Sequence, residues 1–378
     1  MTPLPLKLLI TATALLLCTA SLAAPRDIKP AADSDVIETL PARIRSAGNT
    51  PEGAAASARE WIQLSRQEAD PRYLGRAQAV LAPWWDKPDA PPALAILQAT
   101  VQQSRHEFAA ARKTLLATLK RDPSQAQGWL TLATLEHLSG QYAAAASACE
   151  QVARNGAALY ASACQLETLS LQGRHDEARQ GYETLIQRAA DAGTRAWLLS
   201  LLAESEERAG RDSEAARAYQ ASLAAGPDGY TALVYADMLL RTSRPQDALK
   251  TLEKQPASDA TLLRQAYARK LLGDAKWQPM AAELRERFAA LDARGEDKAP
   301  HARERALGAL WLDGNAAAAS QFAQLNLSLQ KEPLDWWLAL HTARLAGRSA
   351  ELARTRSALA ATGLQDARLA ALRDDAKP

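Results

Sequence analysis

The sequence predicts an all-α chain built as a stack of antiparallel helix pairs. From Ala58 onward, apolar residues recur at helical spacing, and no alternating run typical of a strand lasts four residues. Alanine is abundant while phenylalanine is scarce, and small side chains suit closely packed helices. Helical stretches of similar length are separated by Gly, Pro or Asp-Pro, which indicates an internal repeat.

The composition is that of a water-soluble chain with a large core. The 378 residues are 47% hydrophobic and 23% charged, with a formal net charge of +2. The charges of both signs are mixed along the chain, with no basic cluster. Because nucleic-acid binding depends on clustered Lys and Arg, we expect no nucleic-acid partner.

Residues 1–23 are expected to be a signal peptide. Lys7 is followed by a short apolar run, and Ser21 and Ala23 are small residues that suit cleavage after Ala23. We therefore expect a periplasmic or secreted protein, with no membrane span after signal cleavage. A second interpretation, lipid anchoring at Cys18, is less favoured because Leu17 stands where a small residue is needed.

Two polar segments flank the predicted helical array. Residues 24–57 contain one short apolar stretch and are interpreted as a polar linker or a single capping helix. Residues 58–367 form the array, and residues 368–378 form a polar C-terminal tail.

One segment shows the repeat pattern most clearly. It has the spacing W-x2-L-A followed by G-x-Y-x2-A, given by Trp129, Leu132, Ala133, Gly140, Tyr142 and Ala145. This spacing resembles the tetratricopeptide repeat (TPR), a pair of antiparallel helices about 34 residues long.

The same register extends over most of the chain. Windows begin at Ala58, Pro92, Ala126, Leu159, Ala196, Gly229, Asp259, Pro300 and Leu334. Position 20 of these windows is Ala77, Ala111, Ala145, Ala178, Ala215, Ala248, Gln278, Ala319 and Ala353. A small side chain there lets two helices cross closely. The pattern is weakest in the window from Asp259, so the register between Lys276 and Lys298 is left open.

The resemblance implies a right-handed superhelical solenoid of about nine TPR-like repeats. It also implies a non-catalytic scaffold that binds a peptide or protein partner, of unknown identity, on its concave face. The alternative is a structural or tethering component of an envelope assembly such as exopolysaccharide export.

The concave face of the middle windows has an aromatic row and an acidic row. Inward positions of the first helices are Tyr160, Glu167, Trp197, Glu204, Glu207, Tyr230 and Asp237. Aromatic rings and carboxylates together suit a basic or extended peptide. The other interpretation is that Tyr160, Trp197 and Tyr230 pack against the preceding repeat.

Cys149 and Cys164 remain after signal cleavage, on neighbouring helices in this register. They are either a structural disulfide between two repeats or two buried thiols. The five histidines are scattered, and nucleophile, phosphate-loop and dinucleotide motifs are absent from the sequence. We therefore expect no catalytic site, no cofactor and no metal.

Two tryptophan pairs stand near the ends of the array. The register places Trp84 and Trp337 at packing positions, and leaves Trp85 and Trp336 as expected caps over the open ends of the stack.

Overall fold

A computed structural model describes residues 50–67 and 72–373. The expected signal peptide, its alternative lipid site at Cys18 and most of the linker lie outside the described residues. Within the described ranges every regular secondary-structure element is a helix, and there are no strands. None of the described helices is both long and apolar enough to cross a membrane.

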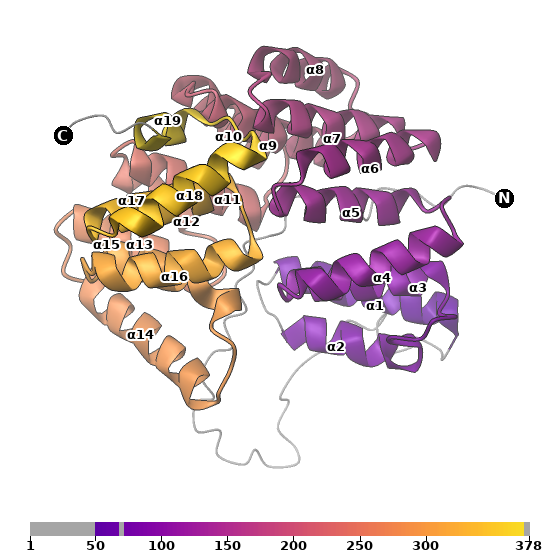
Figure 1. Cartoon of the computed structure of the whole chain (residues 1–378), viewed down its shortest axis with the longest axis horizontal. Helices are drawn as coiled ribbons and strands as arrows, with labels where there is room; N and C mark the ends of the chain where they lie inside the picture. Colours follow the sequence, from indigo (N-terminus) through magenta and orange to yellow (C-terminus); the bar gives the residue numbers. More distant parts are fainter. Residues whose placement is uncertain (1–49, 68–71, 374–378) are drawn as a thin grey trace.

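The described helices form nine antiparallel pairs followed by one short helix, α19 (Ala367–Arg373) (Figure 1). The pairs are α1 (Pro51–Gln67) with α2 (Arg72–Leu81), α3 (Pro92–Ser104) with α4 (Phe108–Arg121), α5 (Ala126–Leu138) with α6 (Tyr142–Arg154), α7 (Ala158–Leu171) with α8 (His175–Gln187), α9 (Ala192–Arg208) with α10 (Asp212–Ala225), α11 (Gly229–Arg241) with α12 (Pro245–Leu252), α13 (Asp259–Leu271) with α14 (Trp277–Ala293), α15 (Ala302–Trp311) with α16 (Ala316–Leu329), and α17 (Pro333–Leu345) with α18 (Ser349–Thr362). Two short 3-10 helices are η4 (Ala82–Trp84) and η5 (Ala299–His301).

The ends of the array differ from the expected boundaries. The first helix begins at Pro51, inside the segment expected to be a linker or a single capping helix, because the Ala-rich stretch after Pro51 continues the helix and buries Ala54 and Ala55. Helix α19 begins at Ala367, the last residue of the expected array, and continues into the segment expected to be a polar tail, where Leu369 and Leu372 are buried.

The helix crossings have the small residues that the repeat predicts. Ala77, Ala111, Ala145, Ala178, Ala215, Ala248 and Ala319 are all fully buried. One position differs from prediction, because Ala353 is exposed. In the seventh pair, where the register was left open, the buried alanine is Ala281 and not Gln278.

From α3–α4 onward, the turn inside each pair has a residue with positive φ. Gly140, for example, has φ 70° between α5 and α6. His106 (φ 61°) and Ser243 (φ 59°) hold the equivalent place between α3 and α4 and between α11 and α12. Residues other than glycine rarely adopt this backbone conformation, so the packing of the flanking helices imposes it.

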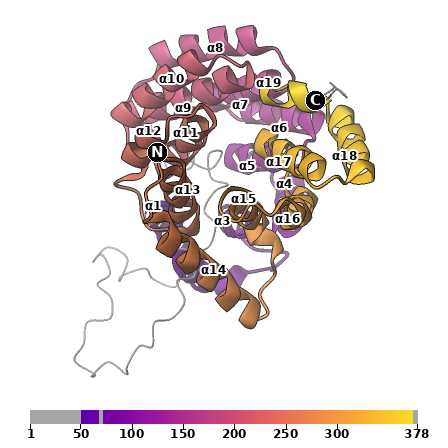
Figure 2. The ribbon, with the colours of Figure 1, turned by 90° about the vertical axis from the view of Figure 1, so that its left-hand side faces the viewer.

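The array curls until its C-terminal end returns to its middle. Figure 2 shows α17, α18 and α19, in yellow, beside the magenta helices α5 to α7. Two backbone hydrogen bonds join these distant segments: the Lys331 N–H donates to Leu138 O over 2.7 Å, and the Gln365 N–H donates to Leu171 O over 2.8 Å. The concave face of the middle repeats therefore faces an interior that the C-terminal helices partly cover.

The second tryptophan pair is distributed differently from the prediction, whereas Trp84 packs as predicted. Trp336 is a core side chain with 2% exposure, whereas Trp337 is half-buried and stacks on His341 at 4.6 Å between ring centroids. Trp84 and Trp85 are both half-buried and pack against the apolar cluster of α1, α2 and α3.

Candidate functional site

A cavity of about 410 Å³ lies on the concave side of the array. Its walls come from α9, α10, α11, α13, α15, the start of α17, and α19. Binding sites for small ligands and short segments have volumes of about 300–1,000 Å³, so this cavity has the size of a binding site.

Four of the predicted groove residues line this cavity. They are Glu204 and Glu207 of α9, and Tyr230 and Asp237 of α11. Consecutive first helices lie side by side in the stack, so equivalent repeat positions come together on the concave face.

The other three predicted groove residues do not line it. Tyr160 and Trp197 are 9% and 8% exposed, and their rings pack together at 5.7 Å between centroids. They belong to the core between α7 and α9. For these two residues the interpretation as packing between repeats holds, and the interpretation as an aromatic row in the groove is corrected. Glu167 lies outside the lining, with Oε2 3.6 Å from His137 Nδ1.

Two of the cavity carboxylates are hydrogen-bonded to arginines of this chain. Glu207 accepts from Arg368 Nη1 at 2.8 Å, from Arg241 Nη2 at 3.3 Å and from the Tyr219 hydroxyl at 3.1 Å. Asp237 accepts two hydrogen bonds from Arg264, at 2.7 and 2.6 Å. The two-pronged Asp237–Arg264 pair fixes geometry strongly, and Glu207 joins arginines of α11 and α19, so these contacts hold the cavity wall in place.

Glu204 is the cavity carboxylate with the weakest pairing. Its Oε1 accepts from the Tyr230 hydroxyl at 3.1 Å, while Oε2 lies 3.8 Å from Arg208 Nη1, beyond hydrogen-bonding distance. Burial raises the pKa of Glu204 to about 8, helped by the negative charges of Glu167 and Glu332 and opposed by Arg208.

Sequence reasoning missed an aromatic wall of the cavity. Tyr267 of α13 and Trp311 of α15 stack with centroids 4.6 Å apart and planes 9° apart. They occupy positions 9 and 12 of their windows, which are the inward positions already assigned in the middle repeats. Extending the same register to the later windows would have found them.

The arginines of the cavity were missed as well. Arg208, Arg241, Arg303 and Arg368 line it, and Arg303 donates two hydrogen bonds to Asp335 at 2.8 Å each. Arg368 comes from the segment expected to be a tail, so no local sequence signal places it beside Glu207.

A second carboxyl group with a raised pKa, that of Glu304, lies deeper in the structure, next to Arg303 in the sequence. Glu304 of α15 is 1% exposed, and neither of its carboxylate oxygens has a hydrogen-bond partner among the described residues. Burial raises its pKa to about 7, against the opposing effect of Arg264 and Arg303.

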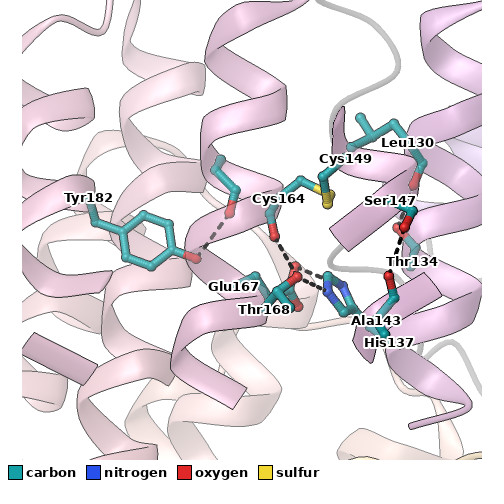
Figure 3. Close-up of a disulfide and its surroundings, with 11 residues drawn as sticks. Leu130, Thr134, His137, Ala143, Ser147, Cys149, Cys164, Glu167, Thr168 and Tyr182 are labelled. Carbon is teal, nitrogen blue, oxygen red and sulfur yellow. Dashed lines mark hydrogen bonds and ion pairs between the residues drawn. A yellow bond between two sulfur atoms is a disulfide. The ribbon is translucent and has the colours of Figure 1, made fainter. Parts of the chain in front are cut away.

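A disulfide joins Cys149 of α6 to Cys164 of α7 (Figure 3). The two Cα atoms are 5.7 Å apart, within the usual range for a disulfide, and both side chains are buried. The bridge ties the third helix pair to the fourth. Beside it, His137 is hydrogen-bonded to the Thr168 hydroxyl at 2.7 Å, and burial lowers the pKa of this histidine.

Within residues 50–67 and 72–373, no group of three or more His, Cys, Asp or Glu side chains is arranged to hold a metal ion.

Comparison with known proteins shows the fold. No family model and no curated protein matches the sequence. The chain is similar to the solved structure of the human IFIT1 dimer with m7Gppp-AAAA, at 12% identity and a TM-score of 0.50, over 83% of this chain and 71% of that one. A Rap protein complexed with competence and sporulation factor matches at 10% identity and a TM-score of 0.48, over 82% and 86% of the two chains. A tetratricopeptide repeat protein from Parabacteroides merdae matches at 14% identity and 0.40, over 64% and 94%. With nine stacked helix pairs among the described residues, and small side chains at most crossings, the chain has the fold of a TPR-like helical-repeat scaffold.

Proposed function

We propose that the chain is an exported, non-catalytic interaction scaffold of the cell envelope, which holds a segment of a protein partner in its interior cavity. The observation that supports this most is the cavity itself, whose lining combines aromatic rings with fixed charges on a rigid stack of helices. Such combinations are typical of protein recognition sites, where buried aromatic and charged anchors contribute most of the binding energy.

The pairing of the charged groups favours a binding role over a catalytic one. Glu207 and Asp237 are each engaged by arginines, which leaves Glu204 as the one weakly paired carboxyl group of these three. Among the cavity-lining residues there is no cysteine or histidine, and the single serine is Ser243 in a turn.

The same pairing disfavours an RNA ligand of the kind in the IFIT1 structure. Arg241, Arg303 and Arg368 already donate to carboxylates, at 2.6, 2.8 and 2.6 Å. The fourth cavity arginine, Arg208, is buried beside Glu204 and donates to the Ser170 hydroxyl. A phosphate at the other three would have to displace carboxylates, so the cavity is poor in the free cations that nucleic-acid binding requires.

Filling the cavity tests this proposal. Val234 of α11 lines it, and Val234→Trp adds a large side chain there. Leu116→Trp is the matched control, because Leu116 is 41% exposed on α4, away from the cavity. The full-length protein and both variants are compared by capture from an envelope extract, with mass spectrometry and far-UV circular dichroism.

We expect one partner to be captured by the parent protein and by Leu116→Trp but lost with Val234→Trp at unchanged helicity. A partner that binds all three proteins equally would contradict binding in the cavity.

Export is tested separately, by fractionation and by the mass of the mature protein. Cleavage after Ala23 predicts a mature chain that begins at Ala24 in the periplasmic fraction. A lipid-modified chain that begins at Cys18, or recovery only from the cytoplasm, would contradict soluble export. The Cys149–Cys164 pair supports an oxidising compartment, because disulfides persist there and are rare in the cytosol.

A further inference from the structure

Glu204 offers a carboxyl oxygen in the cavity, Oε2, that has no close hydrogen-bond partner among the described residues. One oxygen of this carboxyl group accepts from Tyr230, while the other has Arg208 at 3.8 Å and no closer cation among the described residues. The side chain is 21% exposed, and it reaches solvent through the cavity. A ligand that donates hydrogen bonds therefore has an acceptor ready at this point.

The surroundings of Glu204 are short of positive charge. Arg303 is shared between Asp335 and Glu332, and Arg368 is shared between Asp366 and Glu207. Glu167 and Glu332 add negative potential at Glu204. The cavity arginines are thus outnumbered by the carboxylates that they touch, and a ligand with a positive charge would correct the imbalance.

The aromatic lining selects among cations. Tyr267 and Trp311 form a stacked pair, and Trp337 presents a second indole to the same cavity. A planar guanidinium stacks on such rings and donates two parallel hydrogen bonds to a carboxylate, whereas a compact ammonium is more strongly hydrated. Val234, Leu240 and Leu271 supply apolar surface for an aliphatic stem.

Building on the proposed scaffold function, we propose that the cavity accepts an arginine side chain of the partner protein, with its guanidinium seated against Glu204. The partner's arginine donates to the unpaired oxygen of Glu204 and rests on the aromatic wall.

This binding is linked to a proton. The groups that face Glu204 are Arg208 from its own helix, Glu167 from α7, Tyr230 from α11 and Glu332 at the start of α17. Together with burial they raise the pKa of Glu204 to about 8, so near neutral pH the carboxyl group is mostly protonated. A guanidinium favours the ionised form and expels the proton, so affinity rises with pH up to about 8 and then levels off.

The test uses two small probes that differ by one charged group. N-acetyl-arginine amide is the cation, and N-acetyl-citrulline amide is its neutral counterpart of nearly the same shape. Titration calorimetry is run on the full chain at about pH 6.5 and about pH 8.5, in buffers of different ionisation enthalpy. The variant is Glu204→Gln, and the control is Glu150→Gln, which alters a carboxylate that is 59% exposed on α6.

We expect saturable binding of the arginine probe, at least tenfold tighter than the citrulline probe at the higher pH. From the pKa, its affinity at the lower pH is up to roughly 25-fold weaker, with release of about one proton. Glu204→Gln removes both the preference and the pH dependence, whereas Glu150→Gln retains them.

Equal binding of the two probes, no binding, or full preference in Glu204→Gln would overturn the arginine assignment. If Val234→Trp still abolishes partner capture in that case, the scaffold proposal stands and only the assignment of its ligand fails. Conversely, the scaffold proposal would be rejected if the arginine probe bound in a Glu204-dependent way while Val234→Trp left partner capture unchanged.

Discussion

Gly181 in α8 allows a sharp test of how the helix pairs pack. In most pairs the first helix presents a small residue at the crossing, as Ala133 and Ala203 do. In the fourth pair that position is Leu166, and its side chain fills the space left by Gly181. A Cβ atom added at Gly181 would lie 2.3 Å from Leu166 Cδ2 and 2.8 Å from Cδ1, so the Leu166 side chain would have to move.

Two opposing effects determine what Gly181→Ala does. Replacing a helical glycine by alanine stabilises a helix by about 1 kcal/mol, and overpacking a crossing costs roughly 1–3 kcal/mol. Gly308 of α15 provides the control, because a Cβ there would meet its nearest neighbours at 3.9 Å, an ordinary contact. We expect Gly308→Ala to be stabilising and Gly181→Ala to be about 1–3 kcal/mol less favourable.

Denaturant unfolding followed by far-UV circular dichroism measures both variants. Adding Leu166→Ala to Gly181→Ala removes the clash, so the effect of the alanine should become favourable in that background. The interdigitated crossing would be refuted if Gly181→Ala gained as much stability as Gly308→Ala. It would also be refuted if Gly181→Ala changed the free energy of unfolding in the same direction in the parent and in the Leu166→Ala background.

Three further predictions concern the core and its charges. Ala215→Leu overpacks a fully buried crossing and should cost roughly 1–3 kcal/mol; an unchanged melting curve would contradict the repeat register. The Cys149–Cys164 bridge closes a loop with a sequence separation of 15, so replacing both cysteines by serine should cost about 3 kcal/mol. Alkylation of both thiols under non-reducing denaturation would show that the bridge is absent in solution. Glu304 has a pKa of about 7 in the folded protein against 4.5 ordinarily, so the folded state holds an extra proton between these values and its stability falls as pH rises through them. The free energy of unfolding of Glu304→Gln, relative to the parent, should therefore rise by up to roughly 3 kcal/mol between about pH 4 and pH 8, and a difference independent of pH would contradict the buried carboxyl.

The repeat pattern predicted most of the fold because its positions have a local physical cause. Six of the crossing alanines are fully buried within windows that run from Pro92 to Pro300, and these windows begin within a few residues of the observed first helices. The last window is displaced by one residue. Counting from Pro333, where α17 begins, places Trp336 at the core position and Leu352 at the crossing. A window that starts one residue later, at Leu334, puts Trp337 at the core position and Ala353 at the crossing.

The cavity was only half predictable, because closure of the array is not a local property. Glu204 and Asp237 follow from repeat positions, whereas the contact between Glu207 and Arg368 joins residues 161 positions apart. Such contacts arise when small rotations between successive repeats accumulate until the end of the chain meets its middle. Arg368 then occupies the Glu207 carboxylate that an open groove would offer to a partner. The closed array thus satisfies part of its own acidic row internally, which leaves Glu204 as the point where an external cation can bind.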